Sequence, residues 1–169
     1  MKTLVLGGAR SGKSHYAQQL AEQTGKQIVY IATATAGDNE MKLRIEQHQR
    51  QRPASWTIVE EPLKLADVIK KHVDNGHCIL VDCLTLWLSN CMATEEAGAI
   101  EQQLDNLVET VNGINTDLIM VSNEVGQGIV PMGELSRQFV DESGRMHQKL
   151  AQVCEHVVFI IAGLPQILK

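Results

Sequence analysis

The feature of this sequence that most constrains its fold is a glycine-rich stretch at residues 7–14, GGARSGKS. It follows the apolar stretch TLVL and precedes a segment of helical length that begins at Lys13. The stretch fits the pattern G-x-x-x-x-G-K-[ST], in which backbone N–H groups and the positive end of a helix converge on phosphate oxygens. We therefore predict a phosphate-binding loop, with Lys13 at the β and γ phosphates of a nucleotide and the Ser14 hydroxyl on magnesium.

Apolar stretches of strand length alternate with amphipathic segments of helical length along the whole chain, which is typical of a parallel α/β sheet. We expect strands at residues 3–6, 27–31, 57–59, 78–81, 118–121 and 157–161. We expect helices at residues 13–23, 40–50, 63–73, 99–111 and 133–155. The chain has 169 residues, the length of one domain, so we predict a single domain over residues 1–169. Its expected fold is α/β, a P-loop NTPase-type three-layer fold with a mostly parallel central sheet.

The last predicted helix carries an apolar stripe that we assign to packing. Its members recur at helical spacing: Leu135, Phe139, Met146, Leu150 and Val153.

Charge and composition exclude several classes of protein. The formal net charge of -5 would repel nucleic acid, so we expect no nucleic-acid partner. The longest apolar stretch, residues 157–164, is too short for a membrane helix, and the amino terminus lacks the features of a signal peptide. We expect a cytoplasmic protein without a membrane span. The four cysteines show no C-x-x-C pair, so we expect them to be reduced and structural.

A magnesium site in such a protein needs an acidic residue at the end of a neighbouring strand. Asp82 closes the apolar stretch CILV and is the natural candidate. The alternative is that Asp82 caps a helix beginning at Leu84. We favour the magnesium role.

A second cationic segment lies at residues 42–52, KLRIEQHQRQR. It is a candidate anion-binding site in an otherwise acidic chain. Its histidine, His48, shares a helical face with Ile45, so a partly buried structural histidine is one interpretation. The other is catalytic, because neutral imidazole can attack phosphorus and flanking guanidinium groups can stabilise the developing charge.

Two weaker signals remain. Glu60 and Glu61 precede Pro62 and are either first-turn acids of a helix or contacts to a nucleotide. The segment SNEVGQG at residues 122–128 follows the fifth predicted strand, at the sheet edge where α/β proteins bind ligands, although a plain turn explains its glycines equally well.

Taken together, these motifs resemble one family, the bifunctional adenosylcobinamide kinase/adenosylcobinamide-phosphate guanylyltransferases of cobalamin biosynthesis. Besides GGARSGKS, the resemblance rests on YIATAT at residues 30–35, NEM at 39–41, RIEQH at 44–48, RPASW at 52–56, VEEP at 59–62, LVDCLTLWLSN at 80–90 and SNEVGQGIVP at 122–131. One departure is His147, where the family usually has Asn. A switch GTPase is disfavoured, because the sequence has no N-K-x-D element and its D-x-x-G match falls inside the last predicted helix.

The resemblance implies phosphorylation of adenosylcobinamide by ATP or GTP, followed by transfer of GMP from GTP to adenosylcobinamide phosphate, with release of pyrophosphate. It implies a covalent guanylyl-histidine at His48 and a homotrimer. It also implies magnesium ligation by Ser14 and Asp82, and catalysis by His48 and Lys13. The implied nucleotide-binding residues are Gly7, Gly8, Ala9, Arg10, Ser11, Gly12, Lys13, Ser14, Thr33, Ala34, Thr35, Arg50, Arg52, Glu60, Glu61 and Asp82.

Overall fold

The computed structural model describes residues 1–34, 53–74, 76–94 and 97–169. The strands in this part of the chain are β1 (Lys2–Gly7), β2 (Gln27–Ala32), β3 (Thr57–Glu60), β4 (His77–Asp82), β5 (Asp117–Asn123), β6 (His156–Ile161) and β7 (Leu164–Ile167). The helices are α1 (Lys13–Gln23), α3 (Leu65–Lys71), α4 (Leu84–Thr94), α5 (Ala97–Gly113) and α6 (Glu134–Val153). The helix expected at residues 40–50 lies outside the described residues.

The described strands form one sheet in the order β3-β2-β4-β5-β1-β6-β7. Every pairing is parallel except that of β6 with β7. All six expected strands are present. The strand β7 was not among the expected elements, and α4 was expected only in the alternative that Asp82 caps a helix beginning at Leu84. Since β7 is exposed along its length and contains Pro165, it lacks the apolar pattern that marks the buried strands.

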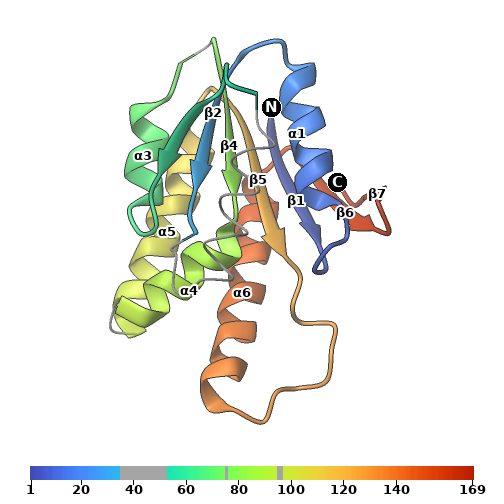
Figure 1. Ribbon diagram of the computed structural model, residues 1–169. Helices are drawn as coiled ribbons and strands as arrows, with labels where there is room; N and C mark the ends of the chain where they lie inside the picture. The colour runs from blue at the N-terminus through green and yellow to red at the C-terminus, as the bar shows by residue number, and fades with distance from the viewer. Residues whose placement is uncertain (35–52, 75, 95–96) are drawn as a thin grey trace.

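Helices cover both faces of the sheet, which gives three layers (Figure 1). Side chains alternate across the strands: on β1, Leu4 and Leu6 face one core and Val5 faces the other. The larger core packs against α3, α4, α5 and α6, whereas Ala17 and Ala21 of α1 pack into the smaller one. Burial on both faces explains why these strands are continuous Val, Ile and Leu stretches.

The first turns of α6 depart from the predicted packing stripe. Met146 and Leu150 are fully buried, but Leu135 is 67% exposed. The reason is visible in Figure 1, where the amino-terminal part of α6 and the segment before it extend beyond the edge of the sheet. The assignment of Leu135 to the core was therefore wrong.

No helix in the described part of the chain has the length and apolar character needed to cross a bilayer.

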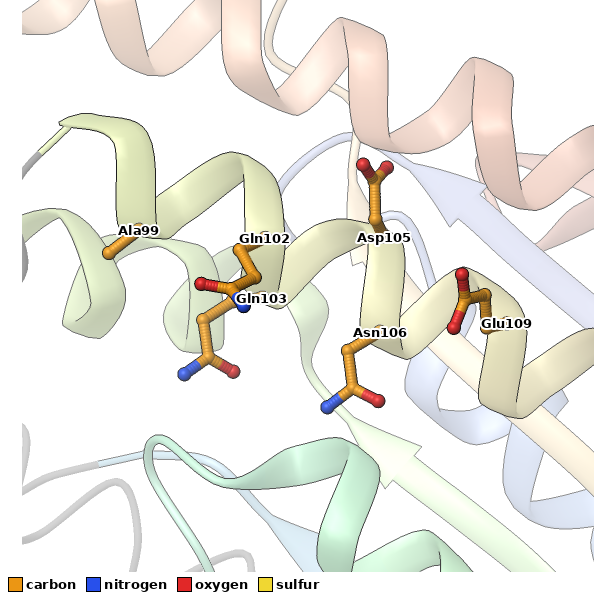
Figure 2. Close-up of a pocket in the computed structure, with 6 residues that line it drawn as sticks. All are labelled: Ala99, Gln102, Gln103, Asp105, Asn106 and Glu109. Carbon is orange, nitrogen blue, oxygen red and sulfur yellow. The ribbon is translucent and has the colours of Figure 1, made fainter.

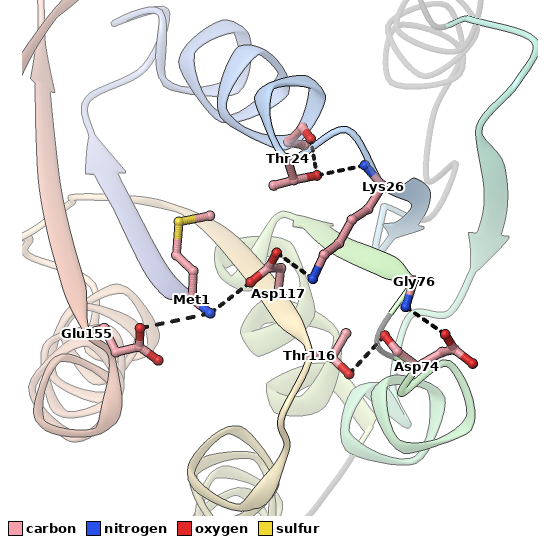
Figure 3. A network of polar contacts seen from close by, with 9 residues as sticks. Met1, Thr24, Lys26, Asp74, Gly76, Thr116, Asp117 and Glu155 are labelled. Atoms are coloured by element: carbon pink, nitrogen blue, oxygen red, sulfur yellow. Dashed lines mark hydrogen bonds and ion pairs between the residues drawn. The ribbon is translucent and has the colours of Figure 1, made fainter.

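An ionic cluster ties together the opposite, amino-terminal ends of the strands (Figure 3). The Asp117 carboxylate accepts hydrogen bonds from the Met1 amino group at 2.8 Å and pairs with Lys26 Nζ at 2.9 Å. Burial by itself raises the pKa of Asp117, but the hydrogen bonds and charges of these two cations outweigh it, so the pKa lies below its ordinary value. The cluster fixes the positions at which β1 and β5 begin. It lies at the end of the sheet opposite to the glycine-rich loop.

Candidate functional site

The glycine-rich loop connects β1 to α1 at the carboxyl end of the sheet, as predicted. Gly12 has a φ of 96°, in the left-handed region that favours glycine. The turn is held by a hydrogen bond from the Ser11 N–H to the Gly8 carbonyl at 3.3 Å, and the Gly163 N–H donates to the Ser11 carbonyl at 2.8 Å. A Cβ at Gly7 would lie only 2.8 Å from the Ile160 carbonyl oxygen. Close packing of backbone around the loop therefore requires these glycines.

Lys13 begins α1 and is only 8% exposed. Its Nζ donates to the Gly8 carbonyl at 3.0 Å, so the side chain folds back across the loop. Burial lowers the pKa of Lys13, and the negative charge of Asp82, which favours the protonated amine, offsets this effect only in part. The loop thus holds a desolvated ammonium group where an incoming phosphate could replace the carbonyl as its partner.

Asp82 ends β4 and lies close enough to Lys13 for the two charges to interact. Because α4 begins at Leu84, the N-cap position belongs to Cys83 rather than to Asp82. This location favours the magnesium interpretation over the cap. One detail of the prediction was wrong: β4 is not the direct neighbour of β1, since β5 lies between them.

Thr33 follows β2 and is fully buried. Its hydroxyl donates to the Cys83 carbonyl at 2.7 Å and accepts from the Cys83 N–H at 2.9 Å. The Asn90 amide donates to the Thr33 carbonyl at 2.8 Å. This geometry favours a structural role for the Thr33 hydroxyl, bracing the turn after Asp82, over direct contact with a nucleotide.

The two glutamates, Glu60 and Glu61, lie at the carboxyl end of β3, at the same end of the sheet as the glycine-rich loop. Glu61 accepts hydrogen bonds through Oε1 from the backbone N–H groups of Leu63 and Lys64, at 2.9 and 2.8 Å. These bonds satisfy donors just ahead of α3, but Glu61 lies before the first turn of that helix, whose acid is Asp67, so the interpretation of Glu61 as a first-turn acid was wrong. Glu60 ends β3 with an exposed side chain. Four predicted site residues, Thr35, His48, Arg50 and Arg52, lie outside the described residues.

The donor types at the loop fit a magnesium nucleotide. A buried Ser11 hydroxyl has no hydrogen-bond partner among the described residues, and it sits inside the loop that would receive phosphate. Ser14 offers a half-buried hydroxyl in the first turn of α1, and Asp82 offers a carboxylate. Oxygen ligands of this kind suit magnesium, which is usually held by few protein groups together with substrate phosphates. Within the described residues, no cluster of three or more His, Cys, Asp or Glu side chains forms a closed metal cage.

Comparison with known proteins adds the decisive observation. Residues 3–168 match the family described as cobinamide kinase / cobinamide phosphate guanyltransferase. The chain belongs to this family. It is therefore a bifunctional enzyme, with a kinase and a guanyltransferase activity.

Individual members of this cobinamide kinase family resemble the chain over nearly their whole length. The chain is 49% identical to the bifunctional adenosylcobalamin biosynthesis protein CobP of Pseudomonas aeruginosa, over 100% of this chain and 98% of that protein. It is 34% identical to the CobU proteins of Escherichia coli and Salmonella typhimurium, over 97% of each chain.

Solved structures at lower identity support the fold. The RadB recombinase gives a TM-score of 0.53 at 16% identity, over 93% of this chain and 72% of that one. An ATPase from a type III secretion system gives 0.56 at 10% identity, over 98% and 57%. The P-loop NTPase-type α/β fold is thereby confirmed.

A groove of about 640 Å³ also lies along α5 of this family member (Figure 2). Two of its polar lining residues make contacts between helices: Asp105 accepts from Lys149 of α6 at 2.6 Å, and Asn106 accepts from Lys70 of α3 at 3.1 Å. No predicted site residue lines it. We attribute the groove to helix packing.

Sequence reasoning missed three buried polar residues beside the site, Thr85, Ser122 and His147. Their hydrogen bonds to one another join α4, β5 and α6. The SNEVGQG segment and the departure at His147 were the available signals, but neither indicated that the residues meet.

Proposed function

We propose that the enzyme phosphorylates adenosylcobinamide with ATP or GTP and then transfers GMP from GTP to adenosylcobinamide phosphate. The products are adenosylcobinamide-GDP and pyrophosphate. The observation that carries the proposal is the glycine-rich loop with its buried Lys13 at the carboxyl edge of the sheet, in a chain of the cobinamide kinase family. In 169 residues both reactions would use one phosphate cradle.

The cradle would hold the nucleotide through backbone N–H groups of residues 7–14 and the amino-terminal end of α1. Lys13 would exchange its bond to the Gly8 carbonyl for phosphate oxygens, keeping its charge next to the transferred group. Ser14 and Asp82 would hold magnesium. When bound, the metal neutralises phosphate charge during transfer. Ala34, Thr35, Glu60 and Arg10 would contribute to nucleotide binding at the rim.

For the second reaction we propose that His48 is the nucleophile, as the family resemblance implies. An imidazole nitrogen attacks the α phosphorus of GTP, and the bond to the bridging oxygen breaks with loss of pyrophosphate. A phosphate oxygen of adenosylcobinamide phosphate then attacks the same phosphorus and releases the imidazole. Arg50 and Arg52 would stabilise the charge on the phosphates in both steps.

The test of this intermediate is incubation with GTP labelled at the α phosphate, followed by denaturing electrophoresis. We expect acid-labile label on the wild-type chain and none on His48→Ala. The matched control is His156→Ala, which removes an exposed histidine at the amino-terminal end of β6, whereas the glycine-rich loop follows the carboxyl end of β1. An active wild-type enzyme that retains no label would refute the covalent intermediate.

Shared use of the cradle is tested separately with Lys13→Ala, which we expect to abolish both activities. Lys70→Ala is the control, because it removes an exposed lysine of α3 whose Nζ donates to Asn106 of α5. Guanylyl transfer that survives in Lys13→Ala would contradict one cradle for both reactions.

We further propose that the enzyme is a homotrimer. The segment before α6 supports association, because Ile129, Val130 and Met132 are 98%, 73% and 97% exposed, and exposed apolar patches mark interaction sites. Analytical ultracentrifugation should give three times the mass of one chain. The double variant Ile129→Ser, Met132→Ser should dissociate, whereas Val73→Ser, at a half-exposed position beyond α3, should not. A monomeric wild-type protein would contradict the trimer.

A further inference from the structure

The carboxyl end of β5 occupies the space between the two halves of the proposed site. In the sheet order, β5 separates β4, which ends at Asp82, from β1, which leads into the glycine-rich loop. Gly7 pairs in register with Asn123 of β5, and Asp82 pairs with Val121. Whatever fixes this end of β5 therefore fixes the separation of the loop and Asp82.

On the β4 side, the link is Thr85, three residues after Asp82 in the first turn of α4. Its hydroxyl accepts a hydrogen bond from the Asn123 N–H at 2.6 Å and lies 3.2 Å from the Ser122 hydroxyl. Thr85 and Ser122 are 7% and 0% exposed. Two hydroxyl groups in a dry environment thus join the turn after Asp82 to β5.

The link on the other side comes from α6. His147 Nε2 lies 2.7 Å from the Ser122 hydroxyl, and Nδ1 lies 3.6 Å from Glu124 Oε2, an electrostatic contact longer than a hydrogen bond. The backbone N–H of Glu124 donates to the Gly7 carbonyl at 3.0 Å. His147 is therefore connected through Ser122 to the Asp82 side and through Glu124 to the loop.

The positions of the hydrogen atoms in this hydrogen-bond network follow from the protonation state of His147. Burial lowers the pKa of His147, and the Glu124 carboxylate offsets this only in part, so the ring is neutral at pH 7. Its single N–H belongs on Nδ1, facing the carboxylate, because Nε2 can then accept the Ser122 hydrogen. Ser122 in turn accepts from Thr85, whose oxygen is occupied by the Asn123 N–H. Each hydroxyl then donates once, Thr85 to Ser122 and Ser122 to His147 Nε2, so the arrangement has one direction.

We call Thr85, Ser122 and His147 the buried bridge. We propose that the buried bridge positions Asp82 relative to the glycine-rich loop, and that His147 is a positioning residue for the phosphoryl-transfer reactions. This inference rests on the proposed function, in which the loop holds the nucleotide and Asp82 holds magnesium. Residues that orient a metal ligand through a second hydrogen bond typically change activity or metal affinity by about 10- to 100-fold when replaced.

Two pairs of variants test the bridge in phosphorylation of adenosylcobinamide by ATP. Thr85→Val and His147→Leu remove the polar atoms at similar volume, whereas Thr85→Ser keeps the hydroxyl and His147→Gln keeps an acceptor where Nε2 was. The matched control is Ser143→Ala. It removes a buried hydroxyl one turn earlier on α6 that has no hydrogen-bond partner among the described residues.

The readouts are kcat, the KM for ATP, and the magnesium concentration at half-maximal rate, each per folded protein. For Thr85→Val and His147→Leu we expect kcat to fall, or the magnesium requirement to rise, by about tenfold or more. The KM for ATP should change less than threefold. Thr85→Ser, His147→Gln and Ser143→Ala should stay within threefold of wild type. If His147→Leu fails to fold, Ser122→Ala replaces it, because it removes the hydroxyl that joins Thr85 to His147.

A purely structural bridge gives a different result. The proposal is overturned if Thr85→Val and His147→Leu melt at lower temperature yet keep wild-type kcat and magnesium requirement, or if Ser143→Ala is equally impaired. Failure of the proposed function would be seen elsewhere, as phosphorylation that survives in Lys13→Ala.

Discussion

Replacing Thr33 by valine should destabilise the fold in a way that the structure quantifies. Valine has nearly the same shape, so no cavity opens at this fully buried position. The variant loses both hydrogen bonds to Cys83. The Cys83 carbonyl still accepts from the Trp87 N–H at 3.2 Å, but no other bond to the Cys83 N–H is found in the described part of the chain. One orphaned donor costs about 1–3 kcal/mol and one lost bond about 1 kcal/mol, so we expect a total of about 2–4 kcal/mol.

Thr33→Ser is the matched control, because it keeps the hydroxyl and removes one methyl group, at a cost of about 1 kcal/mol. The assay is equilibrium unfolding in urea followed by circular dichroism. With an m-value of about 2 kcal/mol/M, Thr33→Val should unfold at about 1 M less urea than Thr33→Ser. If Thr33→Val is as stable as Thr33→Ser, the bracing of the Asp82 turn by this hydroxyl is refuted.

Three further predictions concern other parts of the chain. Gly12→Ala should lower the free energy of unfolding by about 1–3 kcal/mol, because φ is 96° and a Cβ would lie 3.1 Å from Gly163 Cα. The control is Gly8→Ala, whose Cβ would have free space and which should change the free energy of unfolding by less than about 0.5 kcal/mol. Thermal melts measure both variants. Because the pKa of Asp117 is lowered in the folded state, its charge stabilises the fold above the ordinary carboxyl pKa. Wild type should therefore be more stable than Asp117→Asn by up to about 1 kcal/mol at pH 6. The difference should begin to fall as the pH drops below about 4, the ordinary carboxyl pKa, and should vanish only below the lower pKa of the folded state; a constant difference would contradict this sign. Burial raises the pKa of Cys78, Cys83 and Cys154 to about 11. Mass spectrometry after iodoacetamide treatment at pH 8 should therefore show no labelling of native protein and full labelling in denaturant; rapid native labelling would show that the cysteines are accessible.

Much of the site could be predicted because its signals are local. The loop needs glycines at fixed offsets, a lysine at the start of a helix and an apolar strand before it, and all of these are adjacent in the sequence. Asp82 could be predicted by the same reasoning, as the polar residue that ends a buried strand. The roles of Thr33 and Glu61 could not, because each depends on which backbone group lies opposite the side chain after folding.

The errors have physical causes as well. Leu135 follows the apolar period of its helix, but helical period fixes only which face a residue shares, not whether the sheet extends far enough to cover it. The strand β7 escaped prediction because an exposed edge strand has no buried face to leave a pattern in the sequence.

By itself, the sequence determined the α/β class, the phosphate cradle and the residues that would serve it, because strand, loop and helix preferences act over a few neighbouring residues. Only the tertiary structure decided that β5 lies between Asp82 and the cradle, and that Thr85, Ser122 and His147 meet there. Strand order and buried polar contacts join residues that are far apart in the chain, here 37 residues for Thr85 and Ser122. Such contacts form only when the whole sheet assembles, since the loss of water from these groups is compensated by partners that no local pattern specifies.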